Sequence, residues 1–334
     1  MKQNLNNITF IDFCSGIGGG RLGLELNGFK CLGFSEIDKE AIKTYKNFFD
    51  CKKELELGDL TKISPLNLPD FDLLISGFPC QSFSIVGKRE GLENKDKGQI
   101  IYYLAEILKV KQPKFFILEN VKGLISHEKG KTLKIILEIL NECNYNVFWQ
   151  VFNSLEFGLA QSRERIYFVG IRKNLKQDFD IQKLKFDREK KANIKDFLMP
   201  TNENIFNEKS ESFNTFLKYL QNKYNTKKFP KIKLDDLLKR DYLVLDTRQS
   251  DLRIYENKIP TLRRDRQGLL YVFKGNLYRL SGLEALNFQG FSKISNLKEK
   301  IKDLRQSDIL RQCGNAMSVN VIERLANKLK ECNG

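Results

Sequence analysis

A proline–cysteine pair stands in GFPCQSFS (77–84), directly after the apolar run FDLLISG (71–77), which we predict as a strand. A cysteine in such a sharp turn is held away from the core. It becomes a nucleophile if a positive group or a helix terminus lowers its pKa. We therefore interpret Cys80 as a candidate nucleophile and the other six cysteines as structural.

Two further segments offer polar groups at strand ends. Glu119 closes the predicted strand KFFILE (114–119) and would lie beside Cys80 if the two strands are neighbours. Partial burial would raise its pKa and let it donate a proton near neutral pH; otherwise it is a solvated loop carboxylate. Arg163 and Arg165 alternate at the entry to a strand and should project to one side. Such a pair suits a phosphate or a carbonyl, unless both are plain surface arginines.

A glycine-rich turn, DFCSGIGGG (12–20), lies between a predicted strand and a helix. Glycines there let a ligand approach the backbone, and the helix N-terminus favours polar or anionic groups. Glu36 ends the next strand and would hold ribose hydroxyls. The pattern fits a nicotinamide, flavin or AdoMet site, or simply a tight turn.

The elements that position these residues alternate along residues 1–171. We predict strands at 8–14, 30–36, 71–77, 114–119, 147–152 and 166–171, with helices at 39–49, 100–110 and 133–140. This alternation indicates an α/β fold with a doubly wound, mostly parallel sheet and helices on both faces. A further amphipathic helix is predicted at 319–329.

Charge divides the chain unevenly. Of the net charge of +15, residues 1–171 carry +1 and residues 172–334 carry +14, with +10 in residues 172–274 alone. A lysine-rich genome would raise lysine everywhere, so the asymmetry favours a polyanion partner, most simply nucleic acid. We predict a domain boundary after Lys173.

Composition excludes several classes of protein. Seven scattered cysteines and a single histidine, His127, argue against a disulfide framework and exclude a zinc site with two histidines, so no metal is expected. No apolar run is long enough to span a membrane, and the N-terminus lacks the apolar centre of a signal peptide. We expect a cytoplasmic protein.

As an ordered set, these motifs resemble the cytosine-5 DNA methyltransferase family. The resemblance runs from FIDFCSGIGGGRLGLE through GFPCQSFSIVGK, ENVKGL, QSRERIYFVG and RLSGLEALNFQGF to QCGNAMSVNV. It implies a Rossmann-like AdoMet-dependent catalytic domain, residues 1–171 plus 276–334, whose last helix packs back on it. The unmatched, basic residues 172–275 fall where this family has a smaller target recognition domain.

The resemblance also implies residue roles. Cys80 would be the nucleophile towards a flipped-out cytosine, Glu119 would contact ring nitrogen 3 and the exocyclic amine, Arg165 the carbonyl, and Arg163 would support the catalytic loop and site. AdoMet, leaving as S-adenosyl-L-homocysteine, would be held around Gly16, Glu36 (ribose) and Asp59 (adenine amine). The full cofactor set is Cys14, Gly16, Ile17, Gly19, Glu36, Ile37, Asp59, Leu60, Pro79, Ile100, Asn315 and Ala316.

Double-stranded DNA is the implied partner. Two loops, residues 247–253 and 261–268, are predicted to read bases, with arginines able to pair with guanine. The predicted DNA-binding residues are Gln81, Ser84, Lys88, Arg248, Arg253, Thr261, Arg263, Arg264 and Arg266. His127 is assigned a structural or DNA-side role.

The sequence departs from the family pattern at four positions. Cys14 and Ile37 stand where aromatic residues are frequent, which makes the adenine pocket less aromatic. Lys97 and Asn287 stand where arginine is usual, and lysine is a poorer bidentate phosphate ligand. None of the four is Cys80, Glu119 or Arg165, so activity is still expected.

Three other functions remain open on the sequence. A tRNA cytosine methyltransferase on the same scaffold is disfavoured by the large basic insert. A silent DNA-binding relative is disfavoured because Cys80, Glu119 and Arg165 are all present, and a nicotinamide oxidoreductase is supported only by the glycine turn. The compact chain suggests a monomeric methylase. It would either belong to a restriction-modification system, with a cognate restriction endonuclease acting on the same site, or equally be a solitary or phage-borne enzyme.

Overall fold

The computed structural model describes residues 8–79, 100–175, 179, 181, 192–222, 233–248, 252–265 and 267–332. The chain divides into two compact units. The first unit comprises Met1–Asn153, Glu164–Asp187 and Ala316–Gly334, and the second comprises Ser154–Arg163 and Arg188–Asn315.

The first unit is built on a mostly parallel sheet, which among the described residues has seven strands in the order β3-β2-β1-β4-β5-β8-β6. The neighbouring strands β3, β2, β1, β4 and β5 run parallel to one another. Strand β8 runs antiparallel to both β5 and β6. The predicted doubly wound fold is confirmed. The strands are β1 (Thr9–Phe13), β2 (Lys30–Ser35), β3 (Leu55–Glu56), β4 (Leu73–Ser76), β5 (Phe115–Val121), β6 (Tyr145–Asn153) and β8 (Glu164–Arg172).

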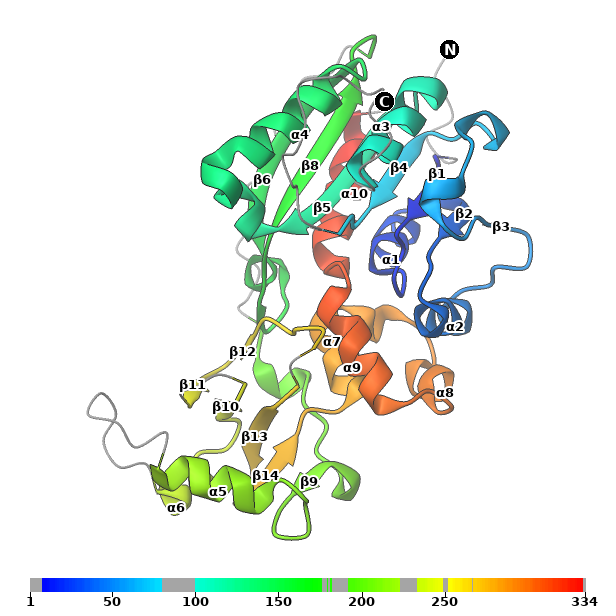
Figure 1. The fold of residues 1–334 in the computed structure, drawn as a ribbon. Coiled ribbons are helices and arrows are strands. Elements are labelled where there is room, and N and C mark those ends of the chain that lie inside the picture. The colour runs from blue at the N-terminus through cyan, green and yellow to red at the C-terminus, as the bar shows by residue number, and fades with distance from the viewer. Residues whose placement is uncertain are drawn as a thin grey trace. The chain divides into compact units, whose positions relative to one another are not determined.

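Helices cover both faces of this sheet because its central strands are apolar on both sides (Figure 1). Ile11 and Phe13 of β1 pack in one core cluster with α3 (Ile100–Lys111) and α4 (Lys131–Asn141). The opposite face carries α1 (Gly19–Glu25), which packs against α10 (Val319–Cys332). Asp38 caps the N-terminus of helix α2 (Lys39–Phe48), since its carboxylate accepts from the amides of Glu40 and Ala41.

The strand order reverses at β1. The chain passes from β1 outward through β2 to β3, then returns to place β4 on the other side of β1. Ligands of doubly wound sheets bind outside the carboxyl ends of the strands at such a switch point. The glycine turn follows β1 and the segment GFP follows β4, so both lie at this edge.

The second unit contains an antiparallel sheet with the order β11-β10-β13-β14-β9 in the described residues. Helices α5 (Phe213–Asn222) and α6 (Leu234–Leu238) pack on it through a core that includes Phe216, Leu237 and Leu270 (Figure 1). A separate parallel pair joins β7 (Gln161–Ser162) to β12 (Ile259–Pro260). The other elements are β9 (Ile205–Phe206), β10 (Val244–Asp246), β11 (Arg253–Tyr255), β13 (Leu269–Phe273), β14 (Asn276–Arg279), α7 (Gly282–Gln289), α8 (Leu297–Ile301) and α9 (Gln306–Asn315).

The packing units differ from the predicted domain boundaries in residues 276–315. Strand β14 is hydrogen-bonded between β13 and β9, so the chain stays within the second unit until Asn315. Helix α10 then belongs to the first unit. No helix among the described residues is long and apolar enough to span a membrane.

Candidate active site

The turn after β1 is shaped by left-handed backbone at Cys14, Gly16 and Gly18 (φ 51°, 56° and 83°). At Gly16 a Cβ atom would meet nothing within 4 Å, so the backbone is open on that side. The amide of Ser15 donates to Ser35 O at 3.0 Å, which ties the turn to the end of β2. A positive φ with open space beside it is what lets a ligand approach a main chain closely.

Two carboxylates at this edge are held in place by backbone donors. Glu36 Oε2 accepts from Gly16 N at 2.8 Å, and Oε1 accepts from the amides of Ile37 (2.8 Å) and Asp38 (2.9 Å). Asp59 Oδ1 accepts from Thr61 Oγ1 (2.8 Å) and Thr61 N (3.0 Å), and these bonds hold the pKa of Asp59 below its usual value. Both carboxylates are therefore oriented acceptors for hydroxyl or amino groups.

These residues fit the cofactor that the resemblance implies. Glu36 offers fixed acceptors to a ribose, the open face of Gly16 leaves room, and Ile37 is 72% exposed, an apolar surface that a purine ring can cover. The rest of the predicted cofactor set is distributed as follows: Ile17, Gly19, Leu60 and Ala316 are buried, Cys14 and Ile100 are half-buried, and Pro79 and Asn315 are exposed.

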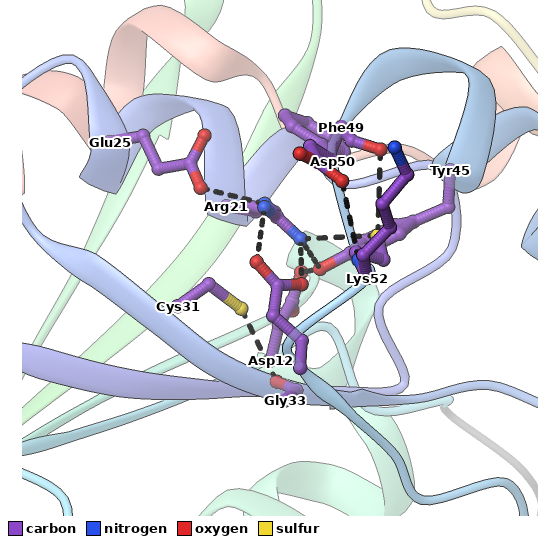
Figure 2. Close-up of polar contacts among 11 residues, drawn as sticks. Asp12, Arg21, Glu25, Cys31, Gly33, Tyr45, Phe49, Asp50 and Lys52 are labelled. Atoms are coloured by element: carbon purple, nitrogen blue, oxygen red, sulfur yellow. Dashed lines mark hydrogen bonds and ion pairs between the residues drawn. The ribbon is translucent and has the colours of Figure 1, made fainter.

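A charged network is centred on the buried side chain of Arg21 (Figure 2). Arg21 of α1 is 3% exposed and pairs with Glu25 (Nε–Oε1 2.8 Å) and with both oxygens of Glu54. Its guanidinium lies over the ring of Phe49, with 4.3 Å to the centroid. The hydroxyl of Tyr45 reaches Asp12 Oδ2 at 3.4 Å, so this network continues to β1 just before the glycine turn.

Asp12 makes the stability of the protein depend on pH. Burial raises its pKa from 3.8 to about 8, and the neighbouring Arg21 only partly offsets this. Between those values the unfolded chain releases the proton that the folded chain keeps, so stability falls as pH rises from about 4 to about 8. Each pH unit crossed in that window costs about 1.4 kcal/mol. Asp12→Asn should therefore flatten the fall in Tm between about pH 5 and pH 8.5.

The measurement is thermal unfolding of both proteins across this range. Asp50→Asn, at an exposed aspartate, is the matched control for the substitution itself. A wild-type minus Asp12→Asn difference in Tm that does not change with pH would contradict the prediction.

Glu119 and Arg165 meet at the end of the β5–β8 ladder. Val121 pairs with Arg165 in this antiparallel ladder, and Arg165 Nε lies 3.0 Å from Glu119 Oε1. The two side chains are 7% and 13% exposed, so the ion pair is largely removed from water. An ion pair of this kind holds both groups in one geometry and presents their remaining polar atoms together.

Asn120 joins this pair to the predicted nucleophile segment, and the sequence reasoning missed it. Its buried Nδ2 donates to Phe78 O at 3.1 Å, and its Oδ1 accepts from Val121 N at 2.8 Å. A Cβ at Gly77 would lie 3.8 Å from Glu119 Oε2. The GFP segment therefore runs alongside Glu119, as expected if the two strands are neighbours. The asparagine in ENV was the available signal.

Arg163 does not act together with Arg165, so the prediction that they converge on one anion is wrong. Arg163 lies in the break between β7 and β8, and so the two arginines do not alternate along one continuous strand. Its Nη1 donates to Leu262 O (3.3 Å), and Nη1 and Nη2 both donate to Gly314 O (3.2 Å each). At 2% exposure it is held inside the second unit.

The two predicted recognition loops lie together. Thr247 N donates to Gly268 O at 3.1 Å, and Arg248 Nη1 donates to Thr261 O at 3.0 Å. Arg248 does not fit its predicted role as a base reader, because its side chain is 2% exposed and ion-paired with Asp246 (2.8 Å). The Thr261 hydroxyl donates to Ser162 O at 2.7 Å. Arg253, Arg263 and Arg264 are exposed.

Several predicted residues lie outside the described part of the chain: Cys80, Gln81, Ser84, Lys88, Lys97 and Arg266. His127 is half-buried, with Nδ1 2.6 Å from Thr132 Oγ1. Asn287 is buried, and its Nδ2 lies 3.7 Å from Met199 Sδ.

The cysteines with described surroundings are poor nucleophiles. Burial raises the pKa of Cys14 to about 12, and that of Cys51 and Cys143 to about 11. It also raises the pKa of Cys31 and of Cys313. A thiol with a raised pKa stays protonated at neutral pH and reacts slowly. In the described ranges no three or more His, Cys, Asp or Glu side chains are grouped to hold a metal.

The first unit has a doubly wound α/β fold with a ligand-binding edge at its switch point. The S. pombe Dnmt2 methyltransferase superposes with a TM-score of 0.68 at 16% identity, covering 97% of this chain and 98% of that one. A model of the C-5 cytosine-specific DNA methylases matches residues 8–331. The chain therefore belongs to the C-5 cytosine-specific DNA methylase family.

Curated relatives include two type II methyltransferases. M.NgoBI of Neisseria gonorrhoeae is 49% identical over 165 residues, which cover 49% of this chain and 51% of that protein. M.HhaI of Haemophilus parahaemolyticus is 39% identical over 203 residues, 60% of each chain. The matched stretches thus span less than two thirds of either relative.

Proposed function

We propose that this protein is a DNA (cytosine-5-)-methyltransferase that methylates carbon 5 of a flipped-out cytosine in a short duplex site. The observation that carries the proposal is the shielded Glu119–Arg165 ion pair beside the GFP segment that leads to Cys80. A nucleophile, a carboxyl and a guanidinium at one sheet edge are what addition to a pyrimidine ring requires.

In the proposed reaction the Cys80 thiolate adds to cytosine carbon 6. Glu119 hydrogen-bonds ring nitrogen 3 and the exocyclic amine, which stabilises the negative charge that addition places on the ring. Arg165 contacts the ring carbonyl and, through its ion pair, keeps Glu119 oriented. After methylation, carbon 5 loses its proton, the carbon 6–sulfur bond breaks, and the thiolate is restored. Asn120 orients this end of β5 against Phe78.

AdoMet supplies the methyl group and leaves as S-adenosyl-L-homocysteine. We assign the ribose to Glu36, the adenine amine to Asp59 and the close backbone approach to Gly16. The exposed side chain of Ile37 would cover the purine in place of a more aromatic residue.

We place DNA recognition in residues 172–275, with catalysis in residues 1–171 and 276–334. The exposed arginines Arg253, Arg263 and Arg264 are the proposed base readers among the described residues. Lysines of the same basic stretch would contact phosphates and position the duplex.

The type II relatives support a role as the modification enzyme of a restriction-modification system. A cognate endonuclease acting on the same site, a monomeric state and a cytoplasmic location form part of the proposal. The family description favours DNA over tRNA as the substrate.

Base-resolution cytosine-conversion sequencing tests the function directly. A plasmid from a methylation-free host would carry the wild-type gene or, in parallel, Cys80→Ser. Protected cytosines within one short motif, lost in the variant, are the expected result. The result that would overturn the DNA assignment is a plasmid with no protected cytosine, although the expressed protein is soluble and its Tm rises with AdoMet. The assay would then turn to tRNA.

A further inference from the structure

One short stretch of the second unit, Ile259 to Leu262, is held at almost every backbone polar group. Ile259 N donates to Ala160 O at 2.8 Å, within the parallel pairing of β12 with β7. Leu262 N donates to the Gln161 side chain (Oε1, 3.0 Å), and Leu262 O accepts from Arg163. Both bonds to Leu262 come from the motif QSR (161–163), which the methyl-transfer chemistry above does not use.

The residues that hold this stretch are themselves anchored. Gln161 is completely buried, and its Nε2 donates to Phe288 O of α7 at 2.9 Å. Arg163 bridges Leu262 O to Gly314 O at the end of α9. Arg248 donates to Thr261 O while Asp246 fixes its guanidinium. We call Gln161, Arg163 and Arg248 the recognition clamp.

Gly314 shows how closely this stretch is held. A Cβ at Gly314 would overlap backbone atoms of Arg263 and Arg264, so only glycine permits the contact. Between Leu262 and Gly268, the described residues make no backbone–backbone hydrogen bond. Three of them, Arg263, Arg264 and Asp265, directly follow Leu262 and are exposed. A rigid stem therefore ends in an exposed basic tip.

We propose that Gln161 and Arg163 are positioning residues for sequence recognition, which set the choice of DNA site and leave the methyl-transfer step largely unaffected. This inference rests on the proposed function. A base contact discriminates only if the side chain that makes it cannot shift to suit another base pair. The recognition clamp removes that freedom from the stem of Arg263 and Arg264. Arg163 then acts through Leu262 and Gly314, without touching the cytosine.

The test measures discrimination and rate separately. Once the wild-type motif is known, the purified full chain would act on a DNA library that contains the motif and all its single mismatches. Gln161→Ala and Arg163→Lys should lower the preference for the motif by about tenfold and raise the KM for DNA. In Gln161→Ala the single-turnover rate at saturating cognate DNA should stay within about threefold of wild type.

The matched control is Arg172→Met. Arg172 also donates to a backbone carbonyl, Gln112 O at 2.5 Å, but it belongs to the first unit and bonds to none of the clamp residues' partners described above. The preference of the Arg172→Met enzyme for the motif should equal that of wild type. If Arg163→Lys keeps full preference for the motif and loses only methyl-transfer rate, Arg163 is catalytic and the inference is overturned.

Hydrogen exchange provides a readout that needs no activity. The Leu262 amide should be protected from exchange in the wild type. In Gln161→Ala its protection factor should fall at least about tenfold, while the protection factors of the β1 amides stay unchanged. If Gln161→Ala does not fold, Thr261→Val removes the bond to Ser162 O from the other side, and Thr261→Ser retains it. Unchanged protection of Leu262 in the folded variant would overturn the inference. If the wild type methylates no DNA, the proposed function fails, and exchange still decides whether the recognition clamp holds this stretch.

Discussion

Replacement of Glu119 by glutamine is expected to lower the methyl-transfer rate by about 10²–10⁴-fold. The glutamine amide has no negative charge to pair with Arg165, and it cannot exchange a proton with ring nitrogen 3 as a carboxyl group can. Because Glu119 is only 7% exposed, water would not replace the lost group. The measurement is a single-turnover assay of labelled methyl transfer to cognate duplex, with AdoMet and DNA binding measured alongside.

Glu164→Gln is the matched control for this prediction. Glu164 lies on the neighbouring strand β8, is 46% exposed and pairs with Lys122 at the surface. Its loss should change the rate little, since exposed ion pairs contribute about 0–1 kcal/mol. A Glu119→Gln enzyme that methylates within about threefold of the wild-type rate would remove Glu119 from the mechanism.

Arg21→Met is expected to lower the free energy of unfolding by about 3–5 kcal/mol. Arg21 is buried, is the cation shared by Glu25 and Glu54, and lies close to Asp12 (Figure 2). Its removal leaves two half-buried carboxylates, Glu25 and Glu54, without this partner and removes the cation from the ring of Phe49. Denaturant unfolding monitored by circular dichroism measures the loss.

Lys46→Met separates burial from charge in this second prediction. Lys46 also pairs with a glutamate, Glu56, but each side chain is 46% exposed. Its substitution should cost no more than about 1 kcal/mol. Equal losses for Arg21→Met and Lys46→Met would show that burial of the network is not what stabilises this edge of the sheet.

The first unit was predictable because its signals are local. Apolar runs such as 8–14 and 114–119 have the length of buried strands, and glycines or polar residues end them. The carboxyl ends of parallel strands meet at one edge of a sheet, so the neighbourhood of the GFP segment and Glu119 followed from strand order alone. The exposure of Ile37 and the donors around Glu36 had no such signal, since both depend on how β2 meets the glycine turn.

What the sequence by itself determined was the set of chemical groups, their order along the chain and the strands that carry them. The tertiary structure alone decided which partner each polar group takes. Arg163 and Arg165 are two residues apart, yet one bonds backbone carbonyls and the other Glu119. Arg248 belongs to the same arginine-rich stretch as the exposed residues Arg253 and Arg263, but its side chain is buried against Asp246. The physical reason is that a buried donor must find an acceptor. For Arg163 the acceptors come from segments about 100 to 150 residues away, whose approach no local pattern specifies.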